Sequence, residues 1–395
     1  MNTPLDHPSA VKALLNIAHA FDHLFLLIFA AAVSTIALDF GFAKWEDLMP
    51  YGAGAFFLFG LGSLPSGRLG DLWGRRSMML VFFGGIGASA LLTSFAQNAW
   101  QLAACLTLIG AFASIYHPVG IPMLMERTRN AGATIGFNGL CGNLGVALAA
   151  LSTGFLIQAW GWRAAFMVPG FLCIAFGALF AKLCPAEQEA PAKRTGGAKV
   201  TLSPKLMARA MLVMTAAAIT SSVLFNFTTN SNGRLLHERF QGIMQDPTQL
   251  GMLLAVVYAI ASIAQVVVGN LVNRFALKPF FMIMVLMQIP LLILASVAQG
   301  WWLFIAITGV MLFIFGAIPF TDVMIARYVD DRMRSRVSGI RLGVSFAISS
   351  LCVFLIGPVV KSIGFESSLL LLACFPVVTL TVLSVLPSAK DERTA

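Results

Sequence analysis

The 395-residue sequence is poor in charge. Only 11% of its residues are Asp, Glu, Lys or Arg, whereas soluble globular proteins contain about 25%. Hydrophobic residues make up 58% of the chain, and the mean hydropathy is +0.85. This composition excludes an ordinary soluble domain and predicts a membrane protein.

The sequence also lacks the common motifs of metal, disulfide and nucleotide chemistry. Its six cysteines fall in or at the ends of apolar runs and show no C-x-x-C spacing, which argues against structural disulfides and zinc sites. No Walker A sequence occurs, so ATP hydrolysis is not indicated. No compact basic domain is present to bind nucleic acid. We therefore expect no cofactor, no resident metal, no nucleic-acid partner and no enzymatic activity, in a protein that acts as a monomer.

Long apolar runs, by contrast, are abundant. A bilayer core about 30 Å thick requires roughly 20 apolar residues per helix, and twelve runs of the sequence meet this requirement. We therefore predict an all-α membrane protein with twelve transmembrane helices. The predicted spans are 12–37, 49–69, 77–97, 99–125, 131–159, 163–183, 205–231, 247–272, 279–298, 300–326, 336–360 and 366–387.

Basic residues are distributed unevenly between the loops. Cytoplasmic loops retain Lys and Arg during membrane insertion, and with a cytoplasmic N-terminus 21 of the 26 basic residues lie on that side. We predict a multi-pass protein of the inner (plasma) membrane with both termini in the cytoplasm. The net charge of +9 is then mostly a topology signal. The five basic residues on the opposite side are Lys44, Arg163, Arg234, Arg239 and Lys361.

The longest polar interruption separates six spans from six. Residues 184–205 are rich in Ala, Pro, Gly and charge, as expected of a flexible linker. GRLGDLWGRR at 67–76 is matched by GNLVNRFALK at 269–278, and TIGFNG at 134–139 by VSGIRL at 337–342. The first match has a constant offset of 202 residues. We predict two homologous six-helix bundles, at 1–183 and 205–395, joined by a cytoplasmic linker at 184–204.

The loop between spans two and three carries a charged motif. Spaced glycines allow close backbone approach, and an Asp between them suits the amides of a helix N-terminus. The pattern G-x-L-x-D-x-x-G-R-R resembles the signature loop of the major facilitator superfamily, and the six-plus-six layout extends the resemblance over the whole chain. The motif consists of Gly67, Leu69, Asp71, Gly74, Arg75 and Arg76.

This resemblance implies the major facilitator fold, with two pseudo-symmetric bundles around a cavity that opens to one side at a time. It also implies that the loop latches the two halves together at the cytoplasmic side, with Asp71 facing the start of span eleven near Ser335 to Gly339. The corresponding gate of the second half is predicted at Gly269, Asn273, Asp322 and Arg341.

Span one contains ionisable residues in apolar surroundings. Asn16, His19, Asp22 and His23 share one helical face, and ionisable groups inside a bilayer normally mark functional sites. The alternative is that both histidines lie near the cytoplasmic mouth and are satisfied by water or a neighbouring helix. We predict a role in proton coupling or substrate binding for His19, Asp22, His23, His117 and Glu126.

Polar or kinked positions in other spans are candidates for lining the cavity. Tyr116-His117-Pro118 and the G-x-x-G-N-x-G of span five resemble the fosmidomycin-resistance-like branch of the superfamily, which implies a drug or other organic solute. Pro118 is expected to kink span four. The candidate cavity residues are Asn16, Tyr116, Pro118, Asn138, Asn143, Asn226, Asn230, Gln265 and Gln288.

These features predict a secondary active transporter that moves a small organic solute or drug and is driven by protons. Two alternatives remain open at the level of the sequence. A transporter of transition metals or metal chelates would use the histidines and Asp22, because imidazole and carboxylate suit such ions. A membrane-embedded enzyme would use the same groups for proton transfer.

Overall fold

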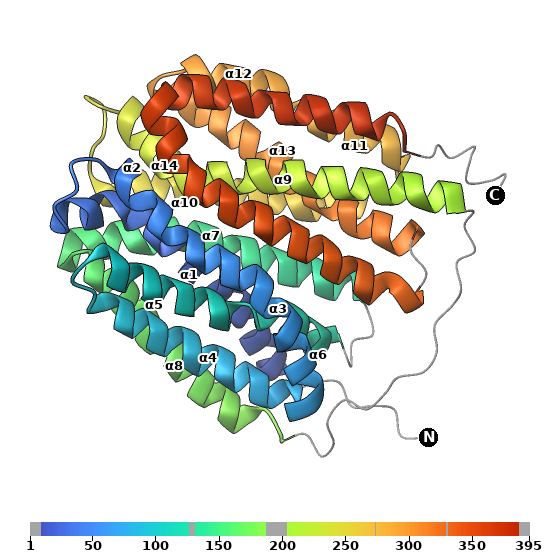
Figure 1. The fold of residues 1–395 in the computed structure, drawn as a ribbon, viewed down its shortest axis with the longest axis horizontal. Coiled ribbons are helices and arrows are strands. Elements are labelled where there is room, and N and C mark those ends of the chain that lie inside the picture. Colours follow the sequence, from blue (N-terminus) through green and yellow to red (C-terminus); the bar gives the residue numbers. More distant parts are fainter. Residues whose placement is uncertain (1–8, 126–130, 187–203, 273, 329–330, 387–395) are drawn as a thin grey trace.

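A computed structural model describes residues 9–125, 131–186, 204–272, 274–328 and 331–386. Within these ranges the chain is helical and contains no strand, and its long helices form one elongated bundle (Figure 1). In this described part, eleven helices are long and apolar enough to cross a membrane. The predicted all-α membrane architecture is therefore confirmed.

The first six predicted spans correspond to ten helical segments. Two spans are subdivided: α2, η1 and α3 follow one another in span two, and span four contains a π-helical turn, η2, between α5 and α6. The segments are α1 (Ser9–Asp39), α2 (Trp45–Leu48), η1 (Met49–Gly52), α3 (Ala53–Trp73), α4 (Arg75–Ser94), α5 (Ala99–Ala113), η2 (Tyr116–Gly120), α6 (Ile121–Met125), α7 (Ala131–Trp160) and α8 (Trp162–Leu183).

The second half contains the remaining six spans. Its last helix, α14, covers both predicted spans eleven and twelve, and it is broken at Gly364, whose backbone is not helical (φ 73°). The eleven apolar helices therefore provide twelve spans. The segments are α9 (Pro204–Arg239), α10 (Pro247–Leu271), α11 (Leu277–Leu286), α12 (Gln288–Val297), α13 (Gly300–Tyr328) and α14 (Asp331–Leu383).

The structure corrects the predicted end of span seven. The span was expected to end at residue 231, but α9 continues to Arg239 and includes Arg234. The helix tolerates this polar stretch because the buried side chains satisfy their hydrogen-bonding groups on backbone carbonyls of the preceding turn. Asn226 Nδ2, for example, donates to Ser222 O at 2.9 Å, and Asn230 Nδ2 donates to Asn226 O at 2.9 Å.

One end of the bundle holds the residues that flank the linker, together with the start of α1 and the end of α14 (Figure 1). We call it the linker end and the opposite end the far end. At the linker end, Arg76 donates to Ala181 O and Cys184 O at 2.7 and 2.8 Å. Lys278 donates to Ser384 O and Leu386 O at 2.6 and 3.0 Å.

These two sets of bonds are equivalent. Lys278 lies 202 positions after Arg76, and Leu386 lies 202 positions after Cys184. In each half, a basic residue at the start of the third span holds carbonyls at the end of the sixth, where helix carbonyls lack intrahelical partners and favour cations. The repeat seen in the sequence is thus a structural repeat, as expected for two pseudo-symmetric bundles.

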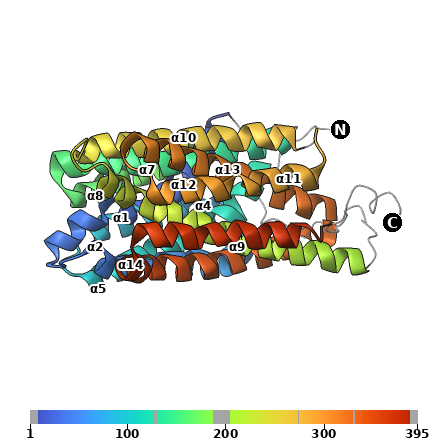
Figure 2. The ribbon, with the colours of Figure 1, turned by 90° about the horizontal axis from the view of Figure 1, so that it is seen from above.

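The two halves meet along α7 with α10 and along α3 with α14, and α7 and α10 run side by side in both views (Figures 1 and 2). Gly251 allows this approach, because a Cβ there would lie 2.6 Å from Ala150 O. At the far end, Asp47 pairs with Lys361. These contacts fix the halves against each other near the far end.

Candidate functional site

Four ionisable side chains meet where α1 and η2 face each other. His19, Asp22 and His23 come from α1, and His117 comes from η2; we call these four residues the His–Asp cluster. His23 Nε2 lies 3.2 Å from His19 Nε2, and His117 Nε2 lies 3.4 Å from Asp22 Oδ2. One nitrogen or oxygen atom from each residue lies within 4.8 Å of the others.

The π-helical turn explains why two consecutive residues of span four both face α1. Pro118 has no N–H to donate and disfavours a regular helix at this point, and π turns are frequent at functional sites. The Tyr116 ring stacks on the His19 ring with centroids 4.6 Å apart, and the His117 ring meets the same ring edge-on at 5.2 Å.

Asn138 of α7 connects the cluster to a second layer of polar residues. Its carbonyl oxygen lies 2.8 Å from His19 Nδ1, so Nδ1 carries the proton and a neutral ring keeps its lone pair on Nε2. The Asn138 amide donates to Asn16 Oδ1 at 2.9 Å and to Tyr116 OH at 2.6 Å. The structure thus gathers three of the residues predicted for the cavity around His19.

A small residue is required on α7 opposite His19. A Cβ at position 142 would lie 2.5 Å from His19 Cε1, so Gly142 leaves the room that the imidazole occupies. Gly142 and Gly145, whose Cβ would meet Ala20 O, therefore pack this helix against span one, as small residues do in membrane helix interfaces.

Asp22 is fully buried, with 0% of its surface exposed. Among the described residues, neither carboxylate oxygen has a hydrogen-bond partner, and the contact with His117 is an ion-pair distance without hydrogen-bond geometry. A buried carboxylate without hydrogen bonds is unfavourable unless it gains a proton or a cation. Asp22 is thus the group of the cluster that most requires a partner.

The predicted gate motif lies at the turn between α3 and α4. Gly74 joins these helices with φ 88°, and Leu69 packs against the core. Arg75 donates to Pro122 O at 3.4 Å, and a Cβ at Gly67 would lie 3.3 Å from Pro118 Cβ. Asp71 is exposed on the last turn of α3.

One residue predicted for proton coupling or substrate binding, Glu126, and several predicted gate residues fall outside what the structure describes. Glu126 and Asn273 are not among the described residues, and neither are the side chains of Asp322 and of the segment expected to face Asp71. In the second-half gate, Arg341 donates to Thr321 Oγ1 at 2.7 Å. Gly269 packs near Pro319, much as Gly67 packs near Pro118.

The predicted cavity residues of the second half occupy separate places. Asn226 donates to Ser349 Oγ at 2.7 Å, and Gln288 donates to Phe313 O at 3.2 Å. Gln265 accepts a hydrogen bond from Asn143 across the boundary between the halves. The structure therefore places these residues in helix contacts and not among the four members of the His–Asp cluster.

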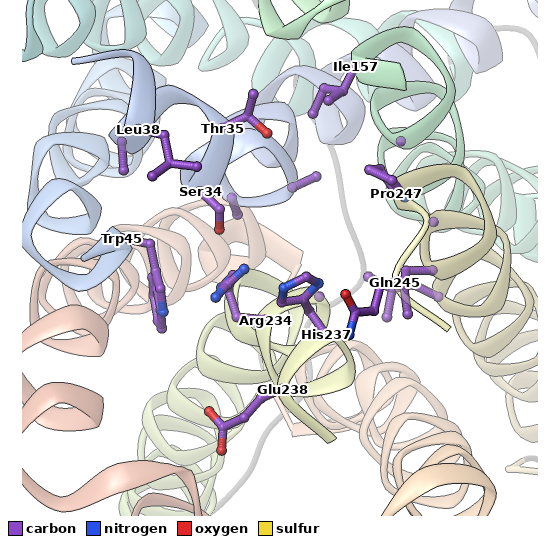
Figure 3. Close-up of a pocket in the computed structure, with 18 of the residues that line it drawn as sticks. Ser34, Thr35, Leu38, Trp45, Ile157, Arg234, His237, Glu238, Gln245 and Pro247 are labelled. Atoms are coloured by element: carbon purple, nitrogen blue, oxygen red, sulfur yellow. The ribbon is translucent and has the colours of Figure 1, made fainter. Parts of the chain in front are cut away.

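A cavity of about 610 Å³ opens at the far end between the two halves. Arg234 and His237 project from α9 toward Ser34 of α1, whereas Glu238 points away (Figure 3). The Arg234 guanidinium also lies 5.6 Å from the centroid of the Trp45 ring. Sequence reasoning missed this far-end cavity because it ended span seven before Arg234. The sequence signal that would have revealed it is the spacing of Arg234 and His237, three residues apart as on one face of a helix.

Helix α1 contributes to both polar regions. Its residues 30–38 include wall residues of the far-end cavity, and its earlier residues form the His–Asp cluster. Between them, residues 24–29 are all apolar and buried. The two polar regions of this helix are therefore separated by an apolar segment.

Comparison with known proteins identifies relatives of the whole fold. The family model described as Major Facilitator Superfamily matches residues 15–236 and 210–395. The crystal structure of a bacterial homologue of the human lysosomal transporter Spinster, in an inward-facing and occupied conformation, superposes with a TM-score of 0.76. That match covers 98% of this chain and 97% of the other at 14% sequence identity.

More similar sequences match over shorter segments. A gallate transporter of Pseudomonas putida is 28% identical over 158 residues, which cover 38% of this chain and 35% of that protein. A multidrug efflux pump of Mycolicibacterium smegmatis is 27% identical over 183 residues, 46% of this chain and 36% of the pump. A gentisate transporter of Corynebacterium glutamicum is 24% identical over 155 residues, 38% of this chain and 34% of that transporter. The chain thus matches about a third of the length of these relatives.

Proposed function

Because the chain belongs to the major facilitator superfamily, we propose that it moves a small organic solute across the inner membrane by alternating access. The observation that carries this proposal is the pair of polar regions on α1, one facing the second half and one buried within the first. In transporters built from repeats, solute and coupling ion meet the protein near the boundary between the repeats. The protein acts as a monomer in this proposal.

The solute we favour is an organic acid that contains an aromatic ring. The far-end cavity provides the guanidinium of Arg234, which suits a carboxylate, and the ring of Trp45 beside it. The gallate and gentisate transporters among the relatives are named for aromatic acids. The multidrug pump makes a drug the second solute class to test.

We propose protons as the coupling ion and the His–Asp cluster as the place where they bind. Imidazole changes charge near pH 6.5 in an unperturbed setting, and buried ionisable residues of membrane proteins commonly relay protons. The geometry supports this role because Asp22 is buried, has no hydrogen bond to any residue that the structure describes, and lies 3.4 Å from His117.

Reconstituted transport tests this function. Purified protein in proteoliposomes is expected to accumulate gallate, gentisate or a drug when a pH gradient is imposed, and a protonophore is expected to abolish the accumulation. Arg234→Gln should lower uptake of the acids and leave that of a cationic drug unchanged. Uptake equal to that of protein-free vesicles for every solute would reject the proposal, and chemical conversion of a solute without translocation would instead indicate an enzyme.

We further propose that the linker end faces the cytoplasm, as the 21 basic residues assigned to that side suggest. Single cysteines introduced at Thr195 and Lys390, in a cysteine-free chain shown to insert, should react with an impermeant thiol reagent only after the cells are opened. Labelling of either position in intact cells would contradict this orientation.

A further inference from the structure

We propose that the His–Asp cluster is a binding site for one divalent transition-metal ion, with three imidazole nitrogens and one carboxylate as ligands. The inference goes beyond proton-coupled solute transport and does not depend on it, although a bound ion and the coupling proton would compete for the same four groups. It also departs from the absence of a resident metal that the sequence predicts, because the four ligands come from two spans whose contact no local motif encodes.

The spacing of the donor atoms fits such an ion. Zinc binds histidine nitrogen at about 2.0–2.1 Å in a tetrahedral arrangement, which separates neighbouring ligand atoms by about 3.3 Å. His19 Nε2 and His23 Nε2 are 3.2 Å apart, and His117 Nε2 and Asp22 Oδ2 are 3.4 Å apart. The four donors lie within 4.8 Å of one another. Small side-chain rotations would therefore complete the coordination sphere.

The charge of the site favours a cation. Asp22 is fully buried, and both of its oxygens lack hydrogen-bond partners among the described residues. A single negative charge buried in this way is costly. A divalent ion would offset this charge by binding a carboxylate oxygen, and it would also bind the lone pairs of the neutral imidazoles. The carboxylate therefore supplies an observation independent of the histidine spacing.

A second layer of bonds orients His19 as a ligand. Histidines that bind metals usually donate their other ring N–H to a carbonyl or carboxylate. His19 Nδ1 makes this bond to Asn138 O, and the Asn138 side chain is itself held by Asn16 and Tyr116. His19 Nε2 is thus presented with its lone pair directed toward His23.

The ligand set also defines the class of ion. Imidazole suits Zn²⁺, Co²⁺, Ni²⁺ and Cu²⁺, whereas Mg²⁺ and Ca²⁺ prefer sites made of oxygen alone. The side chain of His117 is 20% exposed, so an ion has a path to the cluster at this residue. Once bound, the ion would tie α1 to η2 within the first half.

Cobalt binding to the purified, tag-free, full-length protein tests the proposal. Co²⁺ is expected to bind with a stoichiometry of one per chain and to show the intense visible d–d bands of tetrahedral coordination, which Zn²⁺ should then displace. Asp22→Asn and His117→Gln should each weaken binding at least tenfold. Excess Zn²⁺ should raise the melting temperature of the parent protein and leave that of these variants unchanged.

The matched control is His237→Gln, which changes the histidine of the far-end cavity and should bind Co²⁺ like the parent. Should Asp22→Asn or His117→Gln fail to fold, His23→Gln at a half-buried position replaces it. The proposal is overturned if the parent binds no Co²⁺ at neutral pH, if the cluster variants bind as tightly as the parent, or if sulfur-to-metal charge-transfer bands reveal cysteine ligands. Solute uptake plays no part in these measurements, so either proposal can fail while the other stands.

Discussion

At the linker end, the two halves use the same bonds: Arg76 in the first half and Lys278 in the second each hold the carbonyls that end the sixth helix. The first helices of the two halves differ much more. Helix α1 buries His19 and Asp22, whereas α9 buries a run of Asn, Thr and Ser side chains that bond within their own helix, among them Asn230.

The features shared by the two halves and the features found in one half therefore have different roles. The end-of-helix bonds stabilise each bundle, so both halves need them. A group that binds a proton or a cation is needed once, and its duplicate would leave another buried charge to compensate. The first half therefore carries the buried His–Asp cluster, whereas Arg234 and His237 of the second half lie at the far-end cavity.

Removing the buried acid should have the largest effect. Asp22→Asn is expected to abolish gradient-driven accumulation and to preserve counterflow, which requires no net proton movement. Its comparator in the second half, Asn226→Ala, loses its bond to Ser349 and should keep accumulation, with stability lowered by about 1 kcal/mol. Uptake in proteoliposomes and thermal unfolding measure the two effects.

The proposed difference between the halves is contradicted if the Asp22→Asn variant accumulates solute as well as the parent protein does and with the same pH profile. Equal loss of accumulation in both variants would likewise contradict the comparison, because Asn226 has no ionisable group. Counterflow must be measured on the same preparations, so that a binding defect is separated from a coupling defect.

Substitutions in the two gate loops should change the transport rate by an amount between the largest and the smallest predicted effects. Asp71→Asn is expected to lower the initial transport rate about tenfold, equivalent to about 1.4 kcal/mol in the barrier, because the first half keeps the charged form of the motif. Asn273→Asp, which restores the acid in the second half, should change the rate less than twofold. Initial rates at matched protein levels decide this, and similar small effects would mean that the motif acts in topology alone.

The smallest effects are expected at the linker end, where the two halves form equivalent bonds. Removing these bonds should lower stability by the same amount in each half. Arg76→Ala and Lys278→Ala each remove two bonds from partly exposed cations, and each should lower stability by about 1 kcal/mol. Apparent melting temperatures measure the loss, with Arg76→Lys and Lys278→Arg as controls that retain a cation. A large inequality between the two alanine variants would argue against an equivalent role for these bonds.

Much of the fold was predictable because its signals are local or periodic. Apolar run length predicts the spans, and the constant offset of the charged loops predicts the two halves. The face shared by His19, Asp22 and His23 follows from helical spacing. Span seven was the main error, because Asn226 and its neighbours resemble the polar end of a helix, whereas in the structure they lie inside α9 and bond to carbonyls of the preceding turn.

The site was less predictable because its contacts join distant parts of the chain. The meeting of His117 with Asp22 depends on a π-helical turn, which spacing alone does not reveal. The bond between Asn143 and Gln265 depends on how the halves dock. The far-end cavity depends on both that docking and the length of α9, so Arg234 was assigned to a loop.

The bonds of Arg76 have a consequence for how the protein is made. Their acceptors, Ala181 and Cys184, belong to the same half, so this closure needs no residue beyond 184, and domains generally fold in the order of their synthesis. The second half then closes through Lys278 in the same way. We therefore expect two polypeptides, separated within the linker and produced together, to assemble into a working protein.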